Sequence, residues 1–135
     1  MWFRYLTLSF LNTILALFAL LGLLTFVVPA SVPGIVFRLV GWVIGFIFSL
    51  GFSYWIFHTK VPTQKDTILL AVFHVVAFML VYSAYGVLFS DFGASVVFTL
   101  DFMVQLGLEL LAILLMSYRI RRTKLQSMLG EGRVL

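Results

Sequence analysis

The sequence predicts an all-α integral membrane protein, a four-helix bundle built from two tandem helical hairpins with both termini in the cytoplasm. Three observations support this fold class. Hydrophobic residues make up 63% of the chain and charged residues only 10%, and the mean hydropathy is +1.16, well outside the range of soluble domains. Four apolar stretches each reach the roughly 20 residues that a membrane-spanning helix needs. Finally, the basic residues gather on one side of these stretches.

The predicted transmembrane domain covers residues 1–118, with helices at about 3–28, 35–57, 67–89 and 94–118. The first stretch is longer than the 7–15 apolar residues usual in a secretory signal, and it contains Asn12, so we expect a retained helix. The second follows an uncharged connection, the third follows two lysines, and the fourth ends where a basic cytoplasmic tail at 119–135 begins.

Orientation follows from the distribution of lysine and arginine. Arg4, Lys60 and Lys65 flank the ends expected on one side, together with most of the basic tail, whereas the first connection has no charge and the third carries Asp91. The positive-inside rule places the basic side in the cytoplasm, which predicts a multi-pass protein of the cytoplasmic (inner) membrane. The net charge of +4 is then a surface for anionic membrane lipid, and no nucleic-acid partner is expected.

Two segments of the chain resemble each other. Residues 53–60 and 117–124 are identical at five of eight positions, at an offset of 64 residues. This predicts two repeated halves of equal orientation; chance similarity between helix ends rich in tyrosine and lysine is the alternative. The same offset places Gly41 and Gly45 opposite Gln105 and Glu109.

The second predicted helix has a small residue at every fourth position. These residues are Gly41, Gly45, Ser49 and Ser53. Such a ridge lets another helix approach closely, and helix packing is the interpretation we favour. The alternative is that the ridge leaves room for a ligand beside the fourth helix.

The last apolar stretch carries Asp101, Gln105 and Glu109 at intervals of four residues, which places them in one stripe on a helix. Each acid near the middle of a bilayer costs roughly 2.5–3.5 kcal/mol on insertion scales, so such residues usually line an enclosed or wet cavity. By depth, Glu109 shares an inner layer with Asn12 and His74, and Asp101 an outer one with Arg38. The candidate substrate-binding or translocation residues are Asp101, Gln105, Glu109, Asn12, Arg38 and His74.

Two interpretations stay open for each acidic residue. We expect Arg38 to pair with Asp101, either as a fixed salt bridge or as an arginine that Asp101 holds until a phosphate arrives. Glu109 is either a neutral hydrogen-bond donor between helices, because a buried carboxyl group favours its neutral form, or an acid that couples transport to protons. His74 is expected to be a packed, hydrogen-bonded side chain.

The same sequence predicts no enzyme. It contains no cysteine, no nucleophile paired with a base and no glycine-rich phosphate loop, and its single histidine and two acids in the apolar segments lack the spacing of metal ligands. We therefore expect no catalytic residues, no metal site and no cofactor.

The N-terminal stretch from Arg4 and Tyr5 to Asn12 and Thr13 resembles GtrA-like proteins, which commonly begin Arg-Phe-x-x-x-Gly-x-x-Asn-Thr. Here Tyr replaces Phe and Ser replaces Gly. Residues 52–57 resemble that family's aromatic motif, often Asn-Arg-x-Trp-Val-Phe, in its last three positions but lack its Asn and Arg. The resemblance implies four helices, cytoplasmic termini and transport of a polyprenyl-phosphate-linked sugar for cell-surface glycosylation.

Charge placement suggests which residues could contact the lipid phosphate in place of the missing pair: Arg4, Lys60 and the basic tail at the inner face, and Arg38 at the outer face. We therefore expect a flippase of lipid-linked sugar. One alternative is a proton-coupled exporter similar to small multidrug-resistance proteins, although these carry their essential Glu in the first helix. Another is an accessory subunit of a membrane glycosyltransferase complex. Because four helices bury little surface, a homo-oligomer is expected, with a glycosyltransferase as a further partner.

Overall fold

The computed structural model describes residues 2–26, 34–59, 61–89, 91, 93, 95 and 99–134. This part of the chain contains no strand and forms four helices: α1 (Trp2–Phe26), α2 (Gly34–Phe57), α3 (Gln64–Phe89) and α4 (Leu100–Val134). All four are long and apolar enough to cross a membrane. The all-α, four-helix membrane fold predicted from the sequence is thus confirmed.

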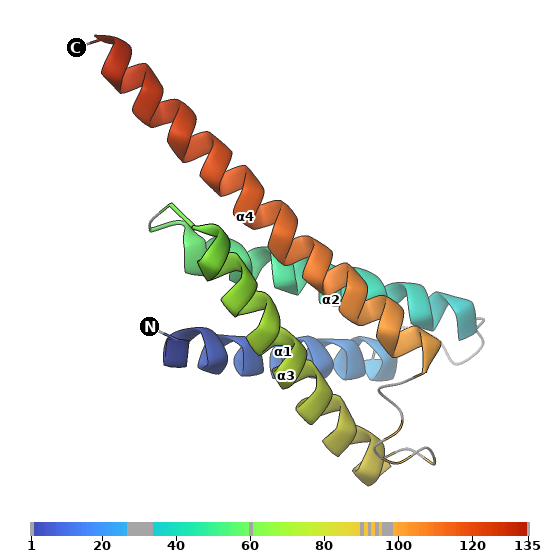
Figure 1. Cartoon of the computed structure of the whole chain (residues 1–135). Coiled ribbons are helices and arrows are strands. Elements are labelled where there is room, and N and C mark those ends of the chain that lie inside the picture. Colours follow the sequence, from blue (N-terminus) through green and yellow to red (C-terminus); the bar gives the residue numbers. More distant parts are fainter. Residues whose placement is uncertain are drawn as a thin grey trace.

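The helices form a ring of contacts in the order α1, α2, α4, α3. The most extensive contacts are between α2 and α4 and between α1 and α3. The contacts within each hairpin, α1 with α2 and α3 with α4, are less extensive. Figure 1 shows α1 beginning, α2 ending and α4 leaving the bundle at the same end, which we call the tail end. The two hairpins therefore lie side by side, with the corresponding helices of the proposed repeat in contact.

A polar cap fixes the start of α3. The Thr63 hydroxyl accepts a hydrogen bond from the Asp66 backbone N–H at 3.2 Å, and the Asp66 carboxylate accepts one from the Thr63 backbone N–H at 3.1 Å. This reciprocal arrangement is a capping box, which satisfies backbone groups that a helix start leaves unpaired. The helix consequently begins at Gln64, three residues before the predicted start, because the cap stabilises a first turn that is polar.

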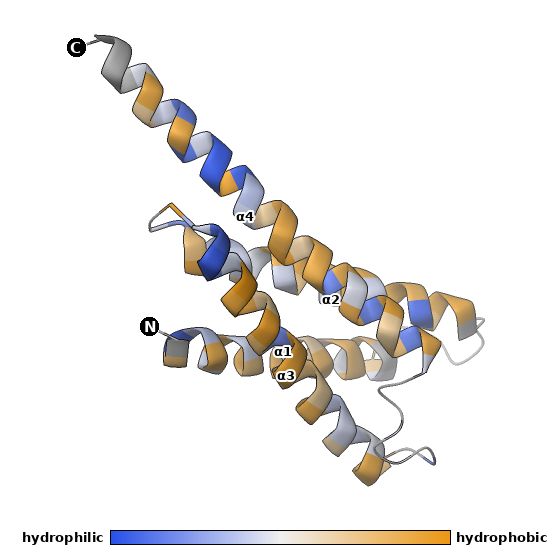
Figure 2. Cartoon of the chain, in the orientation of Figure 1, coloured by the Kyte–Doolittle hydropathy of each residue, from blue (hydrophilic) through white to orange (hydrophobic). Residues whose placement is uncertain are grey.

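The sequence predicted that the fourth helix ends at residue 118. In the structure α4 continues to Val134. Figure 2 shows its hydrophilic turns lying beyond the rest of the bundle. The apolar run ends near Tyr118, yet the residues that follow include several good helix formers, among them Arg, Lys, Leu and Gln, and no proline. The helix therefore continues past the apolar run, and its contacts with the bundle extend to Ile120 and Lys124.

Two apolar clusters make up the core. The larger one lies toward the tail end and contains Tyr5, Ile56, Phe57, Leu70, Ile113 and Ile120. The smaller one is centred on Phe78, Tyr82 and Leu106. His74 on α3 and Glu109 on α4 fall between these clusters in sequence and are buried. A polar layer thus sits in the middle of the bundle, with hydrophobic packing on both sides.

Replacing Thr63 with Ala should destabilise the protein by about 1 kcal/mol, because the first turn of α3 loses its side-chain cap. Unfolding by denaturing detergent in mixed micelles, followed by circular dichroism, measures this change. Thr59→Ala is the matched control, since Thr59 is exposed in the same connection and should leave stability unchanged. Equal effects of the two substitutions would contradict the capping role.

Candidate functional site

A histidine and a glutamate from opposite sides of the α3/α4 interface meet in the middle of the bundle. His74 Nε2 lies 2.6 Å from Glu109 Oε2, and the two side chains are only 1% and 3% exposed. The sequence placed these residues in one layer, and the structure brings them into direct contact. This central pair satisfies a carboxyl group that would be very costly to bury alone.

Gln105 extends the central pair toward the far end of the bundle. Its side-chain nitrogen donates to Glu109 Oε1 at 3.0 Å and to the Tyr82 hydroxyl at 2.9 Å. Both oxygens of Glu109 therefore have partners, and four side chains form one buried network. Tyr82 was not predicted as a member of this network. Its position eight residues after His74 was the available signal, because that spacing puts two residues on nearly the same face of a helix.

The small residues of α2 allow this helix to lie against the central pair. Gly41, Gly45, Ser49 and Ser53 are all buried. A methyl group at Gly45 would overlap Glu109 Oε1 and press on the Gln105 side-chain nitrogen. The packing interpretation of the ridge therefore agrees with the geometry, and Gly45 contacts the residue that the repeat offset placed opposite it.

On the α1 side the network borders a small void. Asn12 donates to the Ser49 hydroxyl at 3.2 Å, but the Asn12 carbonyl oxygen and the Ser9 hydroxyl are buried without a hydrogen-bond partner among the described residues. Both residues line a void of about 10 Å³, together with Ser49, Ser53 and His74 and with apolar side chains of all four helices. This central void is close to the smallest volume that holds one water molecule.

The outer pair predicted from the sequence is present. Arg38 Nε lies 3.1 Å from Asp101 Oδ2, with side chains that are 57% and 39% exposed. The Trp42 indole N–H also donates to the Asp101 main-chain oxygen at 3.2 Å. These contacts join α2 to the first turns of α4 and leave the arginine partly accessible.

A cavity of about 200 Å³ connects the Arg38–Asp101 pair with the buried network. All four helices contribute to it, and its polar lining consists of Arg38, Trp42, Tyr82, Tyr85, Asp101 and Gln105. Asp101 and Gln105 both line this Arg38 cavity, and the deeper part of their stripe, Gln105 and Glu109, is buried in the bundle. Glu109 lies one turn deeper and contacts the cavity residues through Gln105.

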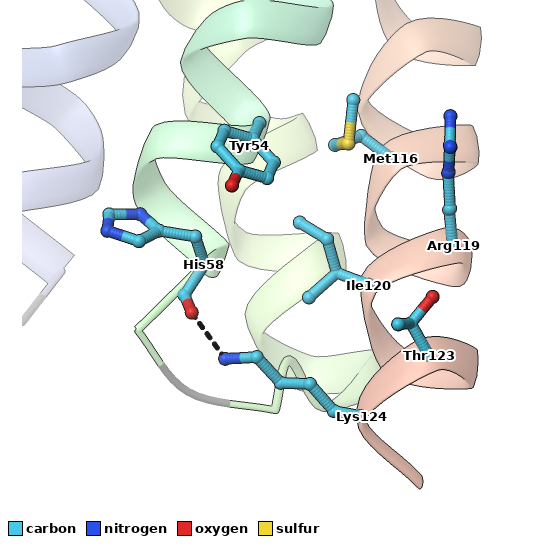
Figure 3. Close-up of a pocket in the computed structure, with 7 residues that line it drawn as sticks. All are labelled: Tyr54, His58, Met116, Arg119, Ile120, Thr123 and Lys124. Carbon is cyan, nitrogen blue, oxygen red and sulfur yellow. Dashed lines mark hydrogen bonds between the residues drawn. The ribbon is translucent and has the colours of Figure 1, made fainter. Parts of the chain in front are cut away.

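A larger cavity, of about 460 Å³, lies at the tail end between α2 and α4. Figure 3 shows Tyr54 and His58 from the end of α2 together with side chains of α4, and Lys124 reaching back toward His58. The Lys124 ammonium group donates to the His58 main-chain oxygen at 2.5 Å and to that of Phe57 at 3.5 Å. Lysine thus satisfies carbonyl groups left unpaired where α2 ends.

The basic run after residue 118 was predicted to face anionic lipid and to contact a lipid phosphate, but this Lys124 cavity was not predicted. Its walls carry the two repeated segments: Tyr54 and His58 belong to 53–60, and Arg119, Ile120, Thr123 and Lys124 belong to 117–124. The repeat was therefore the signal that could have located the cavity, because both copies come to the same end of a closely packed helix pair.

The remaining predicted phosphate contacts are dispersed. Arg4 is exposed near the start of α1, at the tail end, whereas Arg38 belongs to the opposite half of the bundle. Lys60 lies outside the described residues. Within the described part of the chain, no three side chains among His, Asp and Glu come together as a metal site would require.

Comparisons of the chain with protein-family models, with curated proteins and with solved structures found no match. The resemblance to GtrA-like proteins therefore stays a prediction that depends on residues 4–13 and 52–57.

Substituting Gly45 with Ala should displace Glu109 and lower the free energy of unfolding by about 1–3 kcal/mol, the usual cost of overpacking a core. Gly51→Ala is the matched control on the same helix, because nothing lies within 4 Å of a methyl group added there. Unfolding in mixed micelles measures both variants. A Gly45→Ala protein as stable as the Gly51→Ala protein would show that α2 does not press on the carboxylate.

Proposed function

We propose that the protein moves a polyprenyl-phosphate-linked sugar across the cytoplasmic membrane, for use in cell-surface glycosylation. The observation that carries the proposal is the pair of cavities along α2 and α4, each of which combines cationic with aromatic side chains. A lipid phosphate that crosses the membrane needs a favourable contact near both leaflets, and this helix pair offers one at each end.

The Lys124 cavity suits the head group before it crosses. Arg119 and Lys124 line it and can donate charge-assisted hydrogen bonds to a phosphate. Tyr54 supplies an aromatic surface and a hydroxyl group beside them, and it is 55% exposed. A prenyl chain can then lie along the exposed apolar side chains of α2 and α4 while only the polar head group enters the cavity.

The Arg38 cavity suits the head group after it crosses. The planar guanidinium group of Arg38 can bind phosphate through two parallel hydrogen bonds, and in the structure it is paired with Asp101. Trp42 and Tyr85 offer ring surfaces, and Gln105 and Asp101 offer groups that replace the water lost by sugar hydroxyls. A bound phosphate would compete with Asp101 for Arg38.

The two cavities are separated where α2 lies against Glu109. Because Gly45 leaves no space beside the carboxylate, a sugar cannot pass in this arrangement, and α2 and α4 must move apart at that point during transport. We propose that the protein works in the inner membrane with both termini in the cytoplasm, as a homo-oligomer, and that it supplies a membrane glycosyltransferase. The positive-inside distribution of lysine and arginine supports this orientation.

Neutralising the arginine of either cavity should slow transport. Loss of a charged hydrogen bond worth roughly 1.5–3 kcal/mol predicts that Arg38→Gln and Arg119→Gln each lower the flipping rate by about 10- to 100-fold. The assay follows a fluorescent polyprenyl-phosphate sugar in proteoliposomes and its accessibility to a membrane-impermeant quencher.

Arg122→Gln is the matched control, because Arg122 is an exposed arginine of the same helix that does not line the Lys124 cavity. It should flip lipid at the rate of the unchanged protein. The proposal is contradicted if proteoliposomes with the unchanged protein flip no faster than empty liposomes. It is also contradicted if both cavity variants keep the full rate while remaining folded.

A further inference from the structure

We infer that His74 and Glu109 form a proton-binding site, that the central void holds the water molecule through which this site exchanges its proton, and that an anion in the Arg38 cavity binds more tightly when the proton is bound. The identity of that anion as a lipid-linked phosphate depends on the proposed function. The proton site itself does not.

The central pair can take up one proton without breaking its hydrogen bond. The 2.6 Å contact between Nε2 and Oε2 allows a neutral imidazole to donate to the carboxylate in the deprotonated state, in which the pair carries one negative charge. Transfer of a proton from hydronium to the other ring nitrogen, Nδ1, releases water and gives an imidazolium beside a carboxylate, with no net charge. Imidazole is the side chain whose charge normally changes between roughly pH 5 and 8.

The central void provides the exchange partner. Ser9 and Asn12 are only 2% and 4% exposed, yet one polar atom of each has no partner, and His74 lines the same void. A water molecule needs two to four polar partners to be stable inside a protein. Here it can donate to the Asn12 carbonyl oxygen and bond to Ser9 while in contact with the imidazole edge.

No other formal charge faces the central pair among the described residues. α1 presents Ser9 and Asn12, α2 presents Gly45 and Ser49, and α4 presents Gln105. The hydroxyl of Tyr82 on α3 is the one further titratable group, and it contacts Gln105. The charged side chains of Arg38 and Asp101 line the Arg38 cavity, which Gln105 also lines. The charge of the pair is therefore set by its own proton.

This charge acts on the Arg38 cavity at short range. Gln105 lines the cavity and donates to both Glu109 and Tyr82, so an occupant of the cavity is one residue away from the carboxylate. The deprotonated His74–Glu109 pair is negative and repels an anion in the Arg38 cavity, whereas the protonated pair is neutral and does not. Because coupling between two binding sites is reciprocal, the anion should also favour proton uptake. The anion's affinity should rise about tenfold as pH falls, which is within the usual range of such couplings.

The first experiment tests the proton site without any ligand. The full chain, with ¹⁵N-labelled histidine, is placed in lipid nanodiscs and followed by NMR over roughly pH 5–8. The chain has two histidines, so His58→Gln assigns the signals. We expect the His74 ring nitrogens to change protonation state in the unchanged protein and the change to shift in Glu109→Gln. A His74 that keeps one state throughout, or titrates identically in both proteins, overturns the inference.

Asn12→Leu tests the water molecule and remains informative if Glu109→Gln does not fold. Leucine has nearly the size of asparagine but offers the water no polar partner. We expect hydrogen exchange between the His74 ring and solvent to slow by about tenfold. Exchange at the unchanged rate would exclude the central void as the route.

The second experiment measures coupling with a defined probe. A short-chain prenyl sulfate keeps a constant negative charge over this pH range, so changes in its binding report the protein alone. Its affinity for the nanodisc-bound protein, measured by calorimetry, should be about tenfold higher at the acidic limit, and Glu109→Gln should remove that dependence. Equal pH dependence in both proteins overturns the coupling.

If His74 titrates but no lipid is flipped, the proposed function alone fails; if lipid is flipped and His74 does not titrate, this inference alone fails.

Discussion

The arrangement of the bundle depends on the hydrogen bonds that the buried carboxyl group of Glu109 needs in a hydrophobic protein. Glu109 satisfies one oxygen with His74 and the other with Gln105, and each contact constrains a different element. The histidine fixes α3 against α4, and the close approach to Gly45 fixes α2 on the remaining side. Because apolar packing alone gives little orientation to helices in lipid, these polar contacts account for the register of three helices.

The same interface separates two cavities of different character. Near the tail end, basic side chains stand beside the end of α2 and are partly used to satisfy its carbonyl groups. At the other end, Arg38 is paired with Asp101, whose main-chain oxygen accepts a hydrogen bond from Trp42. In both places a cation is already engaged by a protein group that an anionic ligand could replace. Such exchange lets a site bind an anion without leaving an unpaired charge when it is empty.

The features that could be predicted from the sequence are those that depend on hydrophobicity and on the free-energy cost of placing a charge in the membrane. The four spans, the Arg38–Asp101 pair and the common depth of His74 and Glu109 all follow from those two quantities. The predicted bounds were wrong at two helix ends, because the Thr63 cap moves the start of α3 and helix-forming residues extend α4 past its apolar run. Tyr82 and the Lys124 cavity were missed because each depends on which helix faces which, and hydropathy carries no information about neighbours. The family resemblance lacks support from any matching protein.

The uninterrupted course of α4 has a mechanical consequence. Its 35 residues give a rod of about 50 Å, whereas the hydrocarbon core is about 30 Å thick. Asp101 at one end of the rod and the hydrophilic turns beyond the bundle therefore cannot tilt independently. Any movement that separates α4 from α2 also moves the projecting part of α4, and by a larger distance. The position of this part at the membrane surface therefore depends on whether the buried α2/α4 interface is closed.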